Sequence, residues 1–128
     1  YVRMQWLMLQ QQEAEDFVIA TGVQYSVRQF IEWAATELGM HIEWEGKGVD
    51  EVGMVNGKAI VRIDPRYFRP TEVETLLGDP SKAKNKLGWV PEHDLASLVK
   101  DMMASDIDLM KKDVILQKAG HEILKQAE

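Results

Sequence analysis

The chain has 128 residues, of which 45% are hydrophobic, and its formal net charge at pH 7 is −6. This length and apolar content are typical of one folded domain with a core rather than of a disordered segment. The negative charge argues against nucleic acid as the main partner, and the absence of cysteine excludes disulfides, thiolate catalysis and zinc–thiolate sites. No apolar run in the sequence reaches membrane-spanning length, so we expect a cytoplasmic protein.

The first part of the chain predicts two helices and two strands. The opening residues, around Met4 and Met8, are apolar and helical in pattern but lack an N-cap, which suggests a piece of a longer protein. Residues 16–20 form an apolar run typical of a strand buried on both faces. Ser26 is a favourable N-cap for a helix that Gly39 ends. Its core-facing stripe comprises Val27, Phe30, Ile31, Ala34, Ala35 and Leu38. Residues 40–44 alternate as a second strand with one exposed face.

The second part predicts a hairpin and further helices. After a loop over residues 45–53, Asn56 and Gly57 suit a two-residue turn between residues 54–55 and 59–63. Asp79 or Ser81 caps a short helix that ends at Gly88. A helix with apolar residues from 95 to 110 follows, and residues 114–127 form either a helix or a fraying tail. These elements predict an α/β fold of the α+β type, with a small mixed sheet and packed helices.

An arginine-rich run follows the predicted hairpin. Three of the five arginines, Arg62, Arg66 and Arg69, lie within eight residues. A guanidinium group binds phosphate or carboxylate through two parallel hydrogen bonds. Pro70 favours an extended backbone at Arg69 and so orients its side chain, and Glu72 adds an acceptor for a pair of sugar hydroxyls. The run therefore predicts a binding site for a nucleotide or a phosphorylated sugar.

A purely structural interpretation of the same run stays open. Arg66 and Arg69 have Asp64, Glu72 and Glu74 as nearby partners, and exposed ion pairs of this kind contribute at most about 1 kcal/mol each. In an extended segment, side chains three positions apart face opposite sides, so we do not expect both arginines to reach one phosphate. Arg69 is the preferred candidate because Pro70 restricts it.

The sequence offers little catalytic machinery. His41, His93 and His121 are not spaced as metal ligands, and no pair of carboxylates is placed as an acid/base dyad. Neither a glycine-rich dinucleotide fingerprint nor a phosphate-cradling P-loop is present. The residues therefore predict a chain that binds a ligand and lacks the groups to transform it.

Five segments carry a resemblance to a known family, namely residues 17–22, 25–28, 64–73, 77–83 and 87–91. In this order they resemble the C-terminal part of the GDP-mannose 4,6-dehydratases, which are extended short-chain dehydrogenases/reductases acting on nucleotide sugars. The likeness extends from Tyr1 to about Lys112, and residues 66–73 are its most specific part.

The resemblance implies a division of labour between two domains. Family enzymes combine an N-terminal, NADP-binding Rossmann domain, which carries the Tyr/Lys catalytic pair, with a smaller C-terminal substrate domain. Residues 1–128 would form that second domain alone. By similarity, Arg69 holds the substrate diphosphate and Glu72 the ribose hydroxyls of the guanosine, while Arg66 is an additional candidate.

The intact family enzyme is a lyase that converts GDP-mannose into GDP-4-keto-6-deoxymannose. It oxidises C4 through NADP, eliminates water across C5–C6 and returns the hydride to C6. We expect this chain alone to bind GDP-mannose or GDP, without NADP and without catalysis, and to form a homo-oligomer through surfaces that a Rossmann domain would cover. The alternatives are a non-catalytic oligomerisation or binding module and a relative acting on another nucleotide sugar. The segment over residues 47–58 is shorter than in some relatives.

Overall fold

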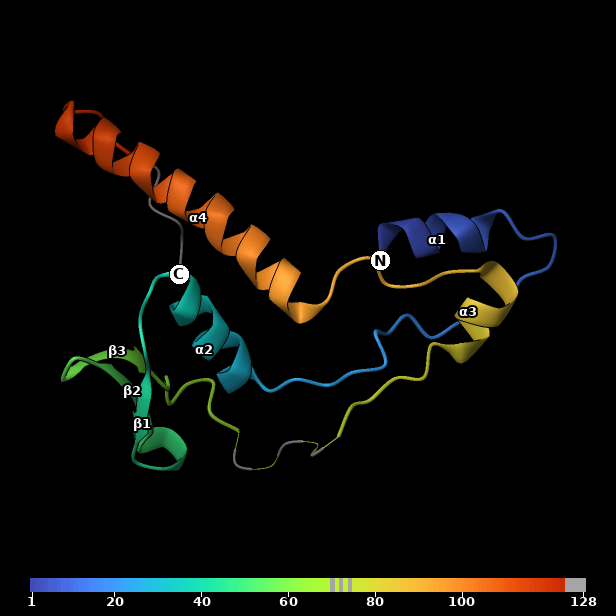
Figure 1. Cartoon of the computed structure of the whole chain (residues 1–128), viewed down its shortest axis with the longest axis horizontal. Coiled ribbons are helices and arrows are strands. Elements are labelled where there is room, and N and C mark those ends of the chain that lie inside the picture. The colour runs from blue at the N-terminus through green and yellow to red at the C-terminus, as the bar shows by residue number, and fades with distance from the viewer. Residues whose placement is uncertain (70, 72, 74, 124–128) are drawn as a thin grey trace.

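The computed structural model describes every residue except Pro70, Glu72, Glu74 and residues 124–128. The described elements are, in chain order, α1 (Val2–Leu9), α2 (Val27–Glu37), β1 (Glu43–Glu45), the 3-10 turn η1 (Gly48–Asp50), β2 (Val52–Val55), β3 (Lys58–Arg62), α3 (Ser81–Leu87) and α4 (Leu95–Lys118). They confirm the α/β fold class. Figure 1 shows α1 and α3 side by side at one end, α2 and the sheet at the other, and α4 running above α2.

The first packed region joins α1 to α3. Met4 and Ala83 are completely buried, and Trp89, just after α3, is 5% exposed. At the edge of this cluster pack Leu7, Met8, Phe17, Ile19 and Leu87. Lys86 of α3 pairs with Glu15 at 2.7 Å and so attaches the segment after α1 to α3. The predicted opening helix is therefore present, and its apolar face is covered by α3 and Trp89.

The strand predicted over residues 16–20 is wrong. The described strands all belong to the sheet of β1, β2 and β3, and residues 16–20 have no ladder with them. Instead, Phe17 and Ile19 pack on the Met4 cluster, while Val18 is 50% exposed. Gly78 approaches so closely that a Cβ at this position would lie 2.7 Å from the Cβ of Ala20. Side-chain packing against distant segments, rather than strand pairing, thus explains the apolar run.

Helix α2 begins and ends where the sequence predicted. The Ser26 hydroxyl accepts from the Gln29 N–H at 3.1 Å, and the Gln29 side chain accepts from the Ser26 N–H at 2.8 Å, which is a capping box. Gly39 follows the C-cap with φ +69°. Of the predicted stripe, Ala35 is buried and the central residues are half-buried, whereas Val27 and Leu38 at the two ends are exposed.

The sheet is small and antiparallel throughout, in the order β1-β2-β3. The predicted hairpin is confirmed, because Asn56 and Gly57 join β2 to β3 with φ values of +50° and +75°, which a primed turn requires. Strand β1 begins at Glu43, later than predicted, although Ile42 before it is buried at 8% exposure.

Helices α3 and α4 begin differently. The predicted cap of α3 at Asp79 or Ser81 is wrong, because the N-cap is Pro80, which makes no side-chain cap hydrogen bond, although Asp79 supports the turn before it. The Asp79 carboxylate accepts from the Ser81 N–H at 2.9 Å, and Gly88 ends α3 in the left-handed conformation. The Asp94 carboxylate accepts from the Ser97 N–H at 2.8 Å at the start of α4. Helix α4 continues to Lys118, so the predicted tail is helical over its first residues.

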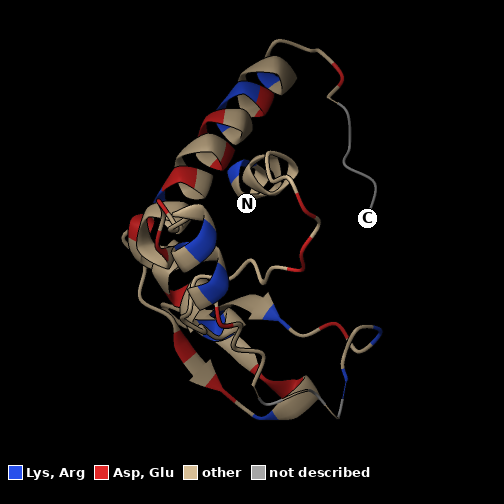
Figure 2. Cartoon of the chain, turned by 90° about the vertical axis from the view of Figure 1, so that its right-hand side faces the viewer, with Lys and Arg blue, Asp and Glu red and all other residues tan. Residues whose placement is uncertain are grey.

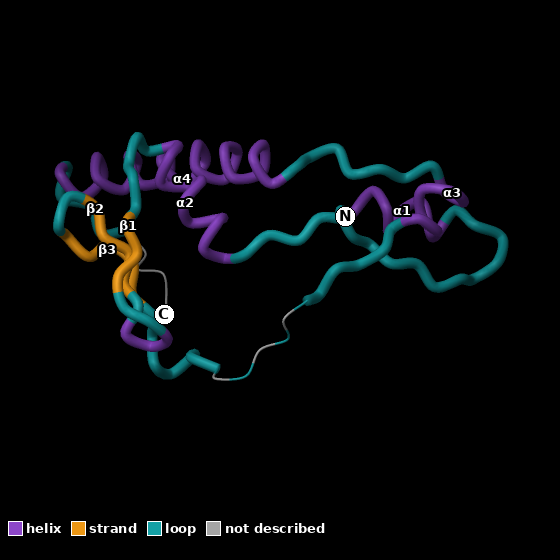
Figure 3. Tube along the Cα trace, turned by 60° about the horizontal axis from the view of Figure 1, so that its bottom comes forward, coloured by secondary structure: helices purple, strands orange, loops and turns teal. Residues whose placement is uncertain are grey.

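The whole arrangement is open. Its accessible surface is 10910 Å², whereas a compact monomer of 14.6 kDa exposes roughly 6,900 Å² by the usual scaling. The two packed regions are connected by long segments that run between them (Figure 3). Helices α2 and α4 pack together, and each buries one residue in this region, Ala35 and Val99. Much apolar surface therefore remains available for further contacts.

Candidate anion-binding site

The arginine-rich run leaves β3 through a tight turn built on Asp64. The Asp64 carboxylate accepts from the backbone N–H of Arg66 at 2.9 Å, and the Asp64 carbonyl accepts from the Tyr67 N–H at 3.1 Å. The Arg66 guanidinium donates to the same carboxylate from Nε at 3.0 Å and from Nη2 at 2.6 Å. Its Cζ also lies 5.5 Å from the centre of the Tyr67 ring. The turn therefore holds Arg66 within a group of three neighbouring residues.

This pairing shifts the protonation of both partners. Hydrogen bonds from the Arg66 side chain, and then from its backbone N–H, hold the pKa of Asp64 below its ordinary value of 3.8. The carboxylate in turn raises the pKa of the Arg66 guanidinium. Asp64 is thus charged at neutral pH and compensates much of the positive charge of Arg66.

The loop between β1 and β2 lies next to the run. A Cβ built on Gly48 would lie 3.8 Å from Cζ of Phe68, so the Phe68 ring lies beside this loop. Gly46 starts the loop with φ +81°, and a Cβ there would lie 2.5 Å from the carbonyl oxygen of Asp50. Only glycine fits this position. The loop and the run thus form one surface beside the sheet.

A polar cluster attaches this surface to α2. Arg28 of α2 forms an ion pair with Glu51, and its Cζ lies 5.0 Å from the centre of the Trp44 ring. The indole N–H of Trp44 donates to Glu32 at 2.8 Å. Because Arg28 and Glu32 are one turn apart on α2, they hold the sheet from two points on the same helix face.

The predicted site residues do not all lie in one part of the structure. Arg66 and Arg69 are both exposed and lie in one short segment, while Arg62 is the last residue of β3. Glu72 lies outside the described residues, so its predicted position beside Arg69 stays a prediction. The ion pair of Arg66 with Asp64 is the one that the structural interpretation of the run foresaw. The Arg66 side chain is thus held by Asp64.

A second groove lies between the start of α1 and the start of α4. It is lined by Tyr1, Arg3, Thr21, Val23, Tyr25, Trp89, Val90, Pro91, Glu92, His93, Asp94, Leu95, Ser97 and Leu98. Arg3 and Glu92 form an ion pair in its wall. Sequence reasoning missed this groove, although residues 17–22, 25–28 and 87–91, which contribute to it, all carry the family resemblance. These segments each combine aromatic residues with turn-forming residues, but no pattern within a few positions indicates that they pack together in the fold.

The remaining chemistry of the described residues is limited. No three histidine, cysteine, aspartate or glutamate side chains in the part that the structure describes are grouped as a metal site would need. Within the same residues, no helix is both long enough and apolar enough to cross a membrane. The arginine-rich run stays the ligand-binding site that the sequence predicts.

Comparisons with a family model and with curated proteins point to the same family. The family model described as GDP-mannose 4,6 dehydratase matches residues 1–102. The chain is 56% identical over 135 aligned positions to the GDP-mannose 4,6-dehydratase of Vibrio cholerae, covering 96% of the chain and 36% of that relative. It is 53% identical to the GDP-mannose 4,6 dehydratase of Drosophila melanogaster over 117 positions (90% and 30%). The Homo sapiens relative of the same name is 50% identical over 113 positions (87% and 30%).

The chain thus spans about a third of the length of these curated relatives, with 36% of the Vibrio cholerae protein covered. That alignment is longer than the 128 residues of the chain, so the relative carries extra residues within it. Whether they lie opposite residues 47–58 stays a prediction. The family match covers α1, α2, the sheet, α3, the arginine-rich run and the first turns of α4. The chain therefore belongs to the GDP-mannose 4,6-dehydratase family.

Proposed function

We propose that this chain is the substrate-binding portion of a GDP-mannose 4,6-dehydratase and binds the GDP moiety of GDP-mannose through its arginine-rich run. The observation that supports this most directly is the exposed Arg66–Arg69 segment, which is set by the Asp64 turn in a chain belonging to that family. Both residues carry exposed guanidinium groups, which suit a diphosphate.

Within this proposal, the two arginines do different work. Arg66 already donates two hydrogen bonds to Asp64, so its charge is partly compensated and it orders the turn. Arg69, three residues later, is the principal ligand of the diphosphate. Glu72 accepts from the ribose hydroxyls. This assignment requires residues 69–72 to bring the two side chains to one ligand.

The residues present do not fit NADP. The described strands form an antiparallel hairpin and one added strand, without a parallel strand–helix–strand unit to hold a dinucleotide. The sequence also lacks the glycine-rich fingerprint of such a unit. We therefore assign no step of the reaction to this chain and propose that it orients the sugar nucleotide. NADP belongs to the intact family enzyme.

The exposed surface supports the domain part of the proposal. An accessible area of 10910 Å² is well above the value of roughly 6,900 Å² expected for a compact monomer of this mass. We propose that residues 1–128 form one substrate-binding domain and that, in a protein as long as the relatives, a Rossmann domain covers part of this surface. A cytoplasmic location is part of the same proposal.

Isothermal titration of the purified chain with GDP-mannose, GDP and UDP tests the binding function. We expect saturable binding of GDP-mannose and GDP, and weaker binding of UDP. The Arg69→Ala variant should lose this binding, because the charge-assisted hydrogen bonds to the diphosphate disappear. The matched control is Arg3→Ala, which removes the same charge at α1, and His93→Ala in the second groove is a further control.

Three results would contradict the proposal. Equal loss of binding in Arg69→Ala and in the two controls would show that the arginine-rich run is not the site. A preference for UDP over GDP would contradict the guanosine assignment. No heat change up to millimolar ligand, with a folded chain by circular dichroism, would contradict autonomous binding and favour the alternative of an assembly module.

A further inference from the structure

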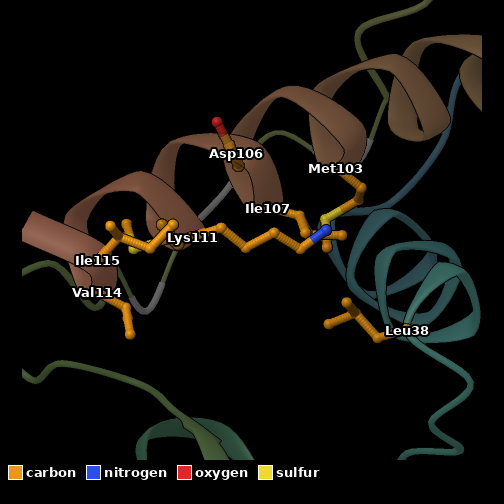
Figure 4. A pocket seen from close by; sticks show the side chains of 8 residues that line it. Leu38, Met103, Asp106, Ile107, Lys111, Val114 and Ile115 are labelled. Atoms are coloured by element: carbon orange, nitrogen blue, oxygen red, sulfur yellow. The ribbon is translucent and has the colours of Figure 1, made fainter.

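The second half of α4 carries an apolar face that the described residues do not cover. A groove there is lined by Leu38, Met103, Asp106, Ile107, Met110, Lys111, Val114 and Ile115 (Figure 4). Near the start of α4, Val99 is 1% exposed, whereas Met110 is 56% and Val114 47% exposed. The face is therefore a continuation of the side of α4 that packs on α2, extended beyond the end of α2 (Figure 1).

The spacing on this face is that of a coiled-coil seam. Met103, Ile107, Met110 and Val114 follow one another at steps of four, three and four residues. In this register, the β-branched Ile107 and Val114 occupy a positions, and the methionines occupy d positions. In parallel coiled coils, β-branched residues at a combined with leucine at d favour two strands, and here methionine takes the place of leucine at Met103 and Met110. The other exposed stripe, Met102, Leu109 and Leu116, recurs only every seven residues and does not form a continuous seam.

The charges beside the seam match a second copy of the same helix. Asp106 and Asp113 occupy g positions, and Lys111 and Lys118 occupy e positions. In a parallel pair, each g residue faces the e residue five positions later on the other helix, which brings Asp106 to Lys111 and Asp113 to Lys118. An antiparallel pair would place acid beside acid and lysine beside lysine. Figure 2 shows that α4 carries both acidic and basic residues.

We propose that residues 106–118 of α4 pair in parallel, and in register, with the same segment of a second copy of this chain. Leu38 borders the groove and limits the pairing on the N-terminal side, where α2 covers the seam. The face begins beyond residue 102, where the match to the family model ends, and it shares no residue with the arginine-rich run, so this dimer is independent of the proposed substrate site. With about three helical turns in contact, the dimer is weak and reversible.

Sedimentation equilibrium of the full 128-residue chain, from about 1 μM to about 1 mM, tests the association. We expect a monomer–dimer equilibrium that Val114→Asp weakens at least tenfold, because a carboxylate would enter the apolar seam. Leu116→Asp is the matched control: Leu116 is 43% exposed, close to the 47% of Val114, but lies on the other stripe. A monomer at every concentration, or equal loss in both variants, would overturn the proposal. Circular dichroism confirms that α4 remains helical.

Two further pairs of variants, each a test with its control, probe the charges and the orientation. Asp106→Lys should weaken the dimer several-fold, because it places two lysines beside each other at both edges. Asp101→Lys, at an exposed position nearer the start of α4, makes the same charge change away from the paired segment and should not weaken the dimer. Because the chain has no cysteine, single cysteines report orientation directly. Gln117→Cys, at a d position, should form a disulfide-linked dimer on mild oxidation, and Lys112→Cys on the outer face should not. If the Gln117→Cys variant still dimerises in sedimentation but forms no disulfide on oxidation, the pairing is antiparallel and the parallel geometry is overturned.

Discussion

The cluster around Met4 and the turn from Asp64 to Tyr67 are held in place by different forces. In the cluster, Met4 and Ala83 are completely buried by residues that are distant in the chain, and removal of apolar area from water stabilises the contact. In the turn, Arg66 keeps 73% of its side chain exposed, and its hydrogen bonds join residues two positions apart. Burial determines the first region, and local hydrogen bonding determines the second.

This difference separates stability from binding. A substitution in the Met4 cluster should lower the free energy of unfolding and leave the ligand chemistry unchanged in molecules that remain folded. A substitution in the turn should change titration or ligand affinity and leave the free energy of unfolding almost unchanged. Three substitutions test this separation, beginning with the largest expected effect.

Met4→Ala should have the largest effect on stability. Deleting most of a completely buried side chain leaves a cavity, and such changes cost about 2–5 kcal/mol in well-packed cores. Urea unfolding, followed by the fluorescence of the nearby Trp89, measures the loss. Leu9→Ala in the same helix is the matched control, because Leu9 is 81% exposed. An equal loss in both variants would mean that the cluster does not stabilise the chain.

Gly46→Ala should have an intermediate effect that links the two regions. The new Cβ would lie 2.5 Å from the Asp50 carbonyl oxygen, at a φ of +81° that side chains rarely adopt, which costs of order 1–3 kcal/mol. Because the Phe68 ring lies beside this loop, binding of GDP should weaken together with stability. Urea unfolding and calorimetric titration measure the two effects. Gly57→Ala, which has no atom within 4 Å of its new Cβ, separates backbone strain from the clash. A Gly46→Ala variant no less stable than Gly57→Ala would contradict the close contact.

Arg66→Ala should have the smallest effect on stability and a clear effect on titration. The pKa of Asp64 should rise toward its ordinary value of 3.8, because the guanidinium hydrogen bonds are lost while the backbone N–H bond remains. Since the folded-state pKa is lowered, the stabilisation by this pair is present at neutral pH and is lost as the pH falls through that lowered pKa. Wild type and variant should therefore converge in stability at low pH. Carboxyl NMR titration measures the shift, and an unchanged pKa of Asp64 would contradict the ion pair.

The helix ends and the hairpin were predictable because their determinants are local. Ser26 with Gln29 forms a capping box within four residues, and Asn56 with Gly57 forms its turn within two. The strand over residues 16–20 was wrong for the opposite reason. Its apolar character was correctly recognised, but an apolar run reveals only that something covers it. That cover is α1 and α3 rather than neighbouring strands.

The candidate site was predictable in composition and only partly in geometry. The clustering of arginines, and Asp64 as a partner for Arg66, could be inferred from spacing. The contact of Phe68 with the loop at Gly48 joins residues twenty positions apart, and no local signal indicates it. The groove that joins residues 21–25 to residues 89–98 was missed for the same reason.

The sequence by itself determined the α/β class, the caps and turns, the family resemblance and the arginine-rich run. These features depend on residue types within a few positions of one another, where backbone geometry is nearly independent of the rest of the chain. Only the tertiary structure decided which apolar surfaces are covered. Residues 16–20 pack against α1 and α3, and Val99 of α4 is buried whereas Val114 is exposed. Phe68 lies beside the Gly46–Asp50 loop. Burial depends on which distant segments meet, and an amphipathic pattern does not indicate which other segment will pack against its apolar face.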